Sequence, residues 1–287
     1  MKILDVSKYQ PNIDYAQVAK QVDGVILRCG VTGWGTANQC STDDCFEKHY
    51  AGFKAVGLPV GAYYYSAADT IAKAQEEAEY CKKILAGKQF ELPIYYDVEC
   101  RERMNKLSKD QLTAQVIAWC DKMEQAGYFV GVYSYTSFIN EKLNIAALAQ
   151  RYTIWLADYR QNYDRTIPRD MHQYTSTAQI AGIAGGVDMS NLFRTNLMET
   201  IQEAGLNGFA EKPAPNVQMY KVVFGGCSQG DKGTALVLGQ KLGLDCSVTN
   251  ADNGLYLVTY SPMTAGDKLA VEQLGRQLAV PVQSSAV

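Results

Sequence analysis

Eight short apolar segments, each of strand length and each ending at polar residues, constrain the fold of this chain more than any other feature. They are KILDVS (2–7), GVILRCG (24–30), PVGAYYYS (59–66), LPIYYDVE (92–99), FVGVYSY (129–135), TIWLAD (153–158), MHQYT (171–175) and GGVDMS (185–190). Helical patterns lie between several of them, most clearly at 71–85 and 108–126. Ser108 and Gln111 form a capping-box signature at the start of the second helix, and Gly127 ends it.

The order and spacing of these segments predict an α/β barrel. Strands that alternate with helices pair in parallel, and near-continuous apolar strands form a sheet that is covered on both faces. The second to fifth segments recur about every 35 residues, the size of a βαβ unit, whereas the last three follow too closely for full helices. We therefore expect a barrel with an incomplete ring of helices.

The segment at 92–100, LPIYYDVEC, is apolar and aromatic, as is typical of a protein interior, but it carries two acids near its end, Asp97 and Glu99. Side chains two apart on a strand face the same way, so these carboxyls should point together at the end of the strand where α/β barrels place their chemistry. Asp5 closes KILD and Asp188 closes GGVD within two other segments. A lone acid at a strand end is usually structural, but paired buried acids cost stability, so we interpret Asp97 and Glu99 as functional.

Aromatic residues share faces with these acids. Tyr63 and Tyr65 share one face of their segment, Tyr133 and Tyr135 share one face of theirs, and Trp155 lies in TIWLAD. Aromatic faces stack on sugar rings, while one carboxylic acid protonates a glycosidic oxygen and a second carboxylate supports the transition state. The combination predicts a saccharide site, although core packing is an equally good interpretation of any single tyrosine.

Other residues have competing interpretations. Tyr64, Tyr95 and Tyr96 are expected to pack between strand and helix, and His172 is interpreted as a hydrogen-bonded structural histidine. Arg28 either orients carboxylates inside the barrel or forms a salt bridge, and the sequence does not decide between the two.

The composition argues against several classes of protein. The net charge of −3 without a Lys/Arg block argues against nucleic acid as a partner, and no apolar run is long enough for membrane insertion. Eight cysteines without a CxxC pair and two histidines argue against a zinc site, and we expect no cofactor. Cys81 and Cys120 are interpreted as buried thiols, and a Cys40–Cys45 disulfide is left open.

Seven motifs in sequence order resemble the glycoside hydrolase family 25 lysozymes, the N-acetylmuramidases of bacteriophage endolysins and of some bacteria and fungi. They are DVSKYQPNIDY, GVILRCG, AVGLPVGAYYYS, LPIYYDVE, GVYSYTSF, IWLADY and GIAGGVDMS, from about Lys2 to Leu206. The resemblance implies an irregular barrel of five βα units plus three strands, which we place at 1–207. It also implies that the catalytic acids are Asp5, Asp97, Glu99 and Asp188. We further predict, from the shared strand faces and the matched motifs, that the substrate-binding residues are Tyr63, Tyr65, Tyr133, Trp155, Gln173 and Arg28.

The reaction implied is cleavage of the β-1,4 bond between N-acetylmuramic acid and N-acetylglucosamine in peptidoglycan. Glu99 would be the general acid/base and Asp97 would stay ionised, while the nucleophile is either Asp97 or the 2-acetamido group of the substrate. The chain departs from the family at the WQY motif, where His172 replaces tryptophan before Gln173 and Tyr174. That departure removes one expected aromatic wall.

The rest of the chain reads as a second module. Residues 208–217, GFAEKPAPNV, have the composition of a linker, and a repeat with a period of 36 follows, beginning at Tyr220 and Tyr256. Each copy reads as strand, loop and helix, so 218–287 should form a two-layer α/β domain with pseudo-twofold symmetry. It resembles the sporulation-related repeat domain, which implies binding to cell-wall glycan strands.

The resemblance and the lack of a leader before MKILDVSKYQ imply a phage or prophage endolysin, made in the host cytoplasm and acting on the wall after release. One alternative is a catalytically inactive barrel that binds wall carbohydrate, but all four acids are present. Another is a Mg²⁺ cage built from the same acids, weakened by the lack of a phosphate-cradling glycine loop. The oligomeric state, the target bacterium and the ligand of the second module are not readable from the sequence.

Overall fold

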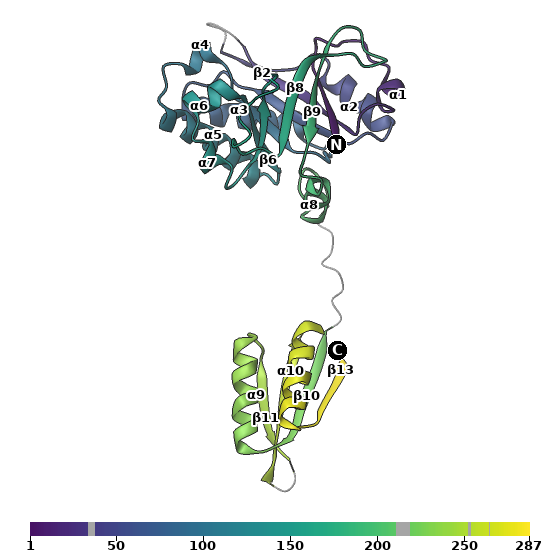
Figure 1. Cartoon of the computed structure of the whole chain (residues 1–287), viewed down its shortest axis with the longest axis vertical. Helices are drawn as coiled ribbons and strands as arrows, with labels where there is room; N and C mark the ends of the chain where they lie inside the picture. Colours follow the sequence, from purple (N-terminus) through teal and green to yellow (C-terminus); the bar gives the residue numbers. More distant parts are fainter. Residues whose placement is uncertain (34–37, 211–218, 252–253, 264) are drawn as a thin grey trace. The chain divides into compact units, whose positions relative to one another are not determined.

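The computed structural model describes residues 1–33, 38–210, 219–251, 254–263 and 265–287 (Figure 1). The chain divides into two compact units, Met1–Lys212 and Pro213–Val287. Most of the linker predicted at 208–217 lies outside the described residues. Gly208, its first residue, still belongs to the first unit, where its carbonyl accepts a hydrogen bond from Gln89 Nε2 at 3.2 Å.

The first unit is a closed barrel of eight strands with one additional strand. The barrel strands are β1 (Lys2–Val6), β2 (Gly24–Thr32), β4 (Val60–Tyr65), β5 (Ile94–Asp97), β6 (Val130–Tyr135), β7 (Thr153–Ala157), β8 (Met171–Ala178) and β9 (Val187–Leu192). Their order is β1-β9-β8-β7-β6-β5-β4-β2, and pairing of β1 with β2 closes the ring. All pairs are parallel except those made by β9 with β1 and with β8. All eight predicted strands and the barrel are thereby confirmed.

The short strand β3 (Cys40–Thr42) was not predicted. It pairs antiparallel with the end of β2. Its three residues are polar or half-exposed, so they carry no apolar alternation by which a strand could be recognised in the sequence.

The helices cover the barrel unevenly. They are α1 (Tyr15–Val18), α2 (Phe46–Ala55), α3 (Ile71–Leu85), α4 (Arg101–Met104), α5 (Lys109–Gln125), α6 (Thr136–Lys142), α7 (Ile145–Leu148) and α8 (Leu197–Glu203). In the order of described elements, β7, β8 and β9 follow one another without a helix between them, so the helical ring is incomplete, as predicted. Ser108 and Gln111 form the capping box of α5, and Gly127 adopts a φ of 81° just beyond its end.

Two apolar layers result from the alternation of side chains along the strands. Tyr64 and Tyr96 lie in the outer layer between sheet and helices, as expected, and Tyr96 stacks on Trp119 with ring centroids 4.4 Å apart. Tyr95 was wrongly expected there. It points into the barrel and packs against Trp155, because residues 95 and 97 share the inward face of β5. The inner layer therefore forms a floor beneath the strand ends.

The second unit is a four-stranded antiparallel sheet with two helices. Its elements are β10 (Tyr220–Cys227), α9 (Gln229–Lys241), β11 (Cys246–Asn250), β12 (Tyr256–Met263), α10 (Ala265–Leu278) and β13 (Val282–Ala286), and the strand order is β11-β12-β10-β13. Each half therefore reads strand, helix, strand. The sequence analysis missed the last strand of each half because CSVTN and VQSSA are largely exposed and polar.

Two lysine–tyrosine contacts join the halves of this unit crosswise. Lys232 Nζ of α9 lies 3.8 Å from the ring centroid of Tyr256 in β12. Lys268 Nζ of α10 lies 4.5 Å from the ring centroid of Tyr220 in β10. Each tyrosine is thus covered by the lysine of the other half, a cation–π contact in both cases.

The structure tests the expectations for the cysteines and for membrane-spanning helices. All eight cysteines are free thiols, so the Cys40–Cys45 disulfide left open above is not formed, and Cys81 and Cys120 are fully buried as expected. Across the described ranges, no helix combines the length and the apolar character needed to cross a bilayer.

Candidate active site

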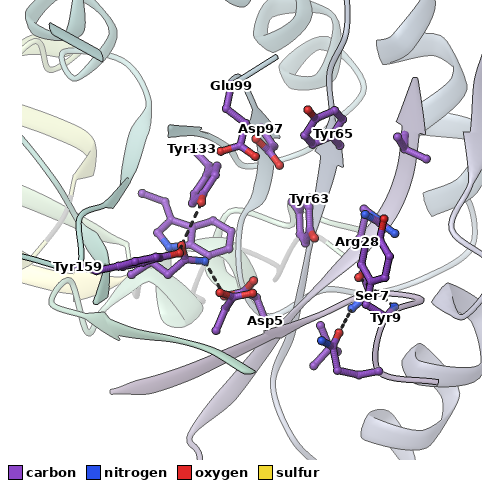
Figure 2. Close-up of a pocket in the computed structure, with 16 residues that line it drawn as sticks. Asp5, Ser7, Tyr9, Arg28, Tyr63, Tyr65, Asp97, Glu99, Tyr133 and Tyr159 are labelled. Atoms are coloured by element: carbon purple, nitrogen blue, oxygen red, sulfur yellow. Dashed lines mark hydrogen bonds between the residues drawn. The ribbon is translucent and has the colours of Figure 1, made fainter. Parts of the chain in front are cut away.

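A cavity of about 380 Å³ opens at the carboxyl ends of the parallel strands (Figure 2). Among the described residues, those that line it are Asp5, Val6, Ser7, Tyr9, Gln10, Arg28, Val31, Tyr63, Tyr65, Asp97, Glu99, Tyr133, Trp155, Tyr159, Gln173 and Asp188. This set contains all ten residues predicted as catalytic or substrate-binding. The structure therefore brings together side chains that are separated by up to 183 positions in the sequence.

Asp97 and Glu99 lie on the same side of the backbone. Asp97 is the last residue of β5, and Glu99 follows two positions later, so the alternation of the strand carries both carboxyls into the cavity. Asp97 is 4% exposed, and its Oδ1 has no hydrogen-bond partner among the described residues. A buried carboxylate oxygen without a donor is unusual, and a bound ligand would satisfy it.

Asp5 and Asp188 reach the cavity from the two strands that close the barrel. They are directly opposite each other in the antiparallel β1–β9 ladder. Asp5 Oδ2 accepts a hydrogen bond from Gln173 Nε2 at 3.1 Å. The amide oxygen of Gln173 accepts from Tyr133 OH at 3.0 Å and from Tyr159 OH at 2.8 Å, so Gln173 joins the acids to two aromatic walls.

The electrostatics of the cavity favour protonated carboxyls. Burial, with the nearby charge of Asp188, raises the pKa of Glu99 to about 7, and burial raises the pKa of Asp188 to about 6. Burial raises the pKa of Asp97 well above its usual range, helped by Glu99 and Asp5, while Arg28 opposes the shift. Burial and then Asp188 raise the pKa of Asp5 in the same way. Glu99 is thus suited to donate a proton near neutral pH, but the direction of these pKa shifts does not single out Asp97 as the ionised partner.

Trp155 forms the floor of the cavity. It is buried, its Nε1 donates to Ser190 Oγ at 3.0 Å, and its ring meets Tyr133 edge-on at 4.6 Å between centroids. Tyr63 also meets this ring edge-on, at 6.2 Å. Tyr63, Tyr65 and Tyr133 are half-buried, so parts of their rings stay available to a ligand. Aromatic walls around acids match the chemistry of a saccharide site.

Arg28 forms a salt bridge and also lines the cavity, so both interpretations drawn from the sequence apply. Its Nε donates to Asp43 Oδ2 at 2.7 Å, and its guanidinium lies 5.1 Å from the ring centroid of Tyr9. Asp43 was not identified from the sequence, because its place beside Arg28 depends on how β3 folds back on β2.

Sequence reasoning missed six of the described residues that line the cavity, of which Val6 and Val31 lie in strands β1 and β2 and the other four lie in loops. Tyr9, Ser7 and Gln10 lie in the loop after β1, and Tyr159 lies in the loop after β7. Loop residues do not follow the apolar periodicity of strands or helices. The one sequence feature that could have identified them as site residues was their position just after segments that carry candidate residues. Tyr159 provides an aromatic wall near Gln173 that the sequence analysis did not foresee.

His172 lies outside the cavity. It is buried, its Nε2 lies 2.8 Å from the carbonyl oxygen of Asp158, and its ring lies 4.1 Å from that of Tyr163. Burial lowers the pKa of His172. It is the hydrogen-bonded structural histidine expected from the sequence, placed on the outward face of β8 while Gln173 points inward.

A second cavity of about 350 Å³ adjoins the first at Glu99. The two cavities share Glu99, Tyr133 and Tyr159, and the second is further lined by Tyr135, Thr136, Ser137, Ala157, Asp158 and Arg160. Glu99 therefore lies at the junction of two spaces. A glycosidic bond placed beside Glu99 would have room for a sugar on either side.

The four acids are not arranged as a metal site. Within the described part of the chain, no three His, Cys, Asp or Glu side chains are grouped so as to hold a metal ion. The magnesium alternative considered for Asp5, Asp97, Glu99 and Asp188 gains no geometric support.

Comparisons with known proteins point to one family. Residues 4–183 match the family described as glycosyl hydrolases family 25. A relative named autolytic lysozyme, from Clostridium acetobutylicum, is 27% identical over 193 residues, which cover 66% of this chain and 55% of the relative. The chain thus spans about half the length of that protein.

Two solved structures share the barrel. The CTP1L endolysin matches with a TM-score of 0.59 and 27% identity, covering 70% of this chain and 68% of that one. The modular autolysin LytC from Streptococcus pneumoniae matches with a TM-score of 0.57 and 30% identity, covering 66% of this chain and 46% of that one.

Proposed function

The chain belongs to the glycosyl hydrolases family 25, and from that premise we propose that it cleaves the β-1,4 bond between N-acetylmuramic acid and N-acetylglucosamine in peptidoglycan. One observation carries the proposal. Glu99, with a pKa of about 7, lies beside Asp97 at the junction of two aromatic-lined cavities. Support for the substrate comes from relatives named as lysozyme, endolysin and autolysin, and LytC is also solved in complex with a synthetic peptidoglycan ligand.

Glu99 acts as the general acid and base. Its raised pKa leaves much of the carboxyl protonated near neutral pH, so it can donate a proton to the glycosidic oxygen. After the leaving sugar departs, the carboxylate accepts a proton from a water molecule, and the oxygen of that water attacks the anomeric carbon of the sugar that remains. The neighbouring carboxyls serve this role because negative charge near Glu99 disfavours its ionisation.

Asp97 orients the 2-acetamido group of the substrate, whose oxygen attacks the anomeric carbon. The unpartnered Oδ1 of Asp97 is a ready acceptor for the acetamido N–H. Such a hydrogen bond favours the ionised carboxylate, and it offsets the upward shift that burial causes in the pKa of Asp97. Asp5 and Asp188 support the pair electrostatically, and Gln173 holds Asp5 in place.

The wider setting is that of an endolysin. The protein would be made in the cytoplasm of a phage-infected or lysogenic bacterium and would reach the wall after release. Similarity to the CTP1L endolysin supports this setting. The second unit would tether the enzyme to wall glycan, which raises its effective concentration near an insoluble substrate.

The reaction is tested by digesting purified peptidoglycan with the wild type and with Glu99→Gln and identifying the new reducing end. N-acetylmuramic acid at the reducing end, lost in the variant while the fold is kept, is the expected result. N-acetylglucosamine ends, free peptides or no products from the wild type would refute the proposal.

A further inference from the structure

The guanidinium of Arg28 is buried in the wall of the first cavity but is incompletely paired. The residue is 9% exposed, and among the described residues its Nη2 has no hydrogen-bond partner. Within the described part of the chain, its ion pair joins Nε to Asp43 Oδ2 at 2.7 Å. Nearly all buried polar groups are hydrogen-bonded, and an unpaired charged donor is especially costly. Because Arg28 lines the cavity, its unpaired donor indicates that a group of the bound ligand accepts the missing hydrogen bond.

Asp43 fixes the orientation of Arg28 from behind. Its Oδ1 accepts from the backbone N–H of Cys45 at 3.0 Å, and its Oδ2 accepts from the backbone N–H of Lys8 at 3.1 Å as well as from Arg28. Asp43 is 3% exposed, so these contacts are held in the protein interior. Backbone donors occupy part of the acceptor capacity of Asp43, which leaves one edge of the guanidinium for another acceptor.

The chemistry of the missing partner follows from the guanidinium. Its planar set of N–H donors matches the two oxygens of a carboxylate. Of the described residues that line the first cavity, Arg28 is the one cation, and four others are the carboxyls Asp5, Asp97, Glu99 and Asp188. An acidic substituent of a substrate therefore has one favourable position in this cavity. Tyr9, which is 73% exposed, covers the guanidinium and can move aside at low cost.

The order of the strands sets the direction of the substrate. Arg28 on β2 is paired in register with Tyr63 on β4, and β4 is followed around the barrel by β5 with Asp97. The second cavity lies beyond Glu99, against residues of β6, the start of α6, the end of β7 and the loop after β7. Arg28 and the second cavity therefore lie on opposite sides of the catalytic pair.

We propose that Arg28 binds a carboxylate carried by the 3-O-lactyl arm of the muramoyl residue and so fixes that sugar in the first cavity, with the leaving N-acetylglucosamine in the second. This inference rests on the proposed function and adds the residue that selects which of the two alternating glycosidic bonds is cut. The carboxylate is either the lactyl group of glycan stripped of peptide or the nearest free acid of the stem peptide.

The test compares rates on matched soluble glycan strands whose carboxylates are free or have been converted to carboxamides. One pair of substrates is stripped of stem peptides by an amidase, and the other pair retains them. The wild type should have a higher kcat/KM on the free-acid form of at least one pair, by about tenfold to a hundredfold, the range of a charge-assisted hydrogen bond. Arg28→Gln should abolish that ratio, mainly through KM. The substrate pair in which Arg28→Gln loses the preference for the free acid identifies whether the carboxylate belongs to the lactyl group or to the stem peptide.

Two further variants make the comparison decisive. Arg160→Gln removes the cation that lines the second cavity, and it should keep the wild-type ratio. If Arg28→Gln fails to fold because buried Asp43 loses its partner, Arg28→Gln combined with Asp43→Asn removes both charges together. Partial unfolding lowers both rates equally, so the ratio still reports on recognition.

The outcomes separate this inference from the proposed function. A wild type that cleaves none of the strands refutes both. A wild type that cleaves free-acid and carboxamide strands equally refutes the role of Arg28 alone, as does a preference that survives in Arg28→Gln. A preference that is lost in Arg160→Gln instead would reverse the proposed direction of the substrate and overturn the inference.

Discussion

Asp5 and Asp188 lie directly opposite each other across the ladder that closes the barrel. Two ionised carboxyls in directly opposed positions destabilise a sheet, and accordingly burial and then the charge of Asp188 raise the pKa of Asp5. The same closure delivers both carboxyls to the cavity. The active site is therefore complete only when the barrel is closed.

The rate of cleavage should fall as the pH rises above about 7. Burial and Asp188 raise the pKa of Glu99 to about 7, and Glu99 must be protonated to donate to the glycosidic oxygen. Initial rates of reducing-end release from soluble glycan, followed from pH 4 to 9, should show an alkaline limb of about tenfold per pH unit. A rate that stays constant to pH 9 would contradict the assignment of Glu99 as the acid.

The free energy of unfolding should also decrease with pH in this range. The pKa of Glu99 is raised from 4.5 to about 7 in the folded protein, so between these values the folded state binds more protons than the unfolded state. The stabilisation is complete below about pH 4.5 and is lost as the pH rises through about 7. Thermal melts of the wild type and Glu99→Gln should diverge across that interval, with the variant less sensitive to pH. Parallel curves would show that Glu99 titrates normally.

Replacing Gln173 by methionine should lower kcat by about tenfold or more, because Asp5 and two tyrosines lose their shared partner. The pKa of Asp5 should rise further, since the hydrogen bond from Gln173 lowers it in the wild type. Gln115→Met is the matched control. Gln115 is also buried and donates to the carbonyl of Ala68, outside the cavity. Equal losses of activity in the two variants would assign Gln173 a structural role only.

Glu77→Ala should destabilise the barrel by about 2–4 kcal/mol without a direct effect on the catalytic groups. Glu77 is fully buried in α3 and accepts from Tyr96 OH at 2.6 Å and from the backbone N–H of Ala67 at 3.2 Å. Its loss deprives both donors of this acceptor, although Tyr96 OH keeps its hydrogen bond with Ser66 Oγ at 2.8 Å. Glu79→Ala removes a half-exposed acid of the same helix, whose ion pairs are screened by solvent, and should destabilise the barrel much less than Glu77→Ala does. Urea unfolding of both variants measures the difference. Similar midpoints would show that the Glu77 contacts contribute little.

A chain that ends after Lys212 should keep its activity on soluble glycan and lose its association with walls, because the barrel is a compact unit by itself. Sedimentation with purified walls measures binding, and circular dichroism checks the fold of the shortened chain. Full-length Glu99→Gln should still sediment with the walls. If the shortened chain sediments as well as the full chain does, the second unit is not a tether.

The sequence was sufficient to predict the barrel because its strands are apolar and bounded by polar residues, a pattern that burial on both faces imposes. It was insufficient for β11 and β13, whose largely exposed residues carry no such pattern. In the site, Asp97 and Glu99 stood out because two acids after a buried strand are costly. Tyr9, Tyr159 and Asp43 lie in or beside loops, and their positions depend on how those loops fold back on the barrel. The opposition of Asp5 and Asp188 required the register of β1 with β9, which no local pattern encodes.

The crosswise contacts of the second unit imply that its halves are interchangeable. Each half carries both members of the contact, a tyrosine at the start of its first strand and a lysine near the start of its helix. Two identical copies of either half could therefore form the same pair of contacts with each other. A peptide that contains one half should accordingly assemble as a symmetric homodimer, and fusion of two such copies in one chain would make that assembly independent of protein concentration.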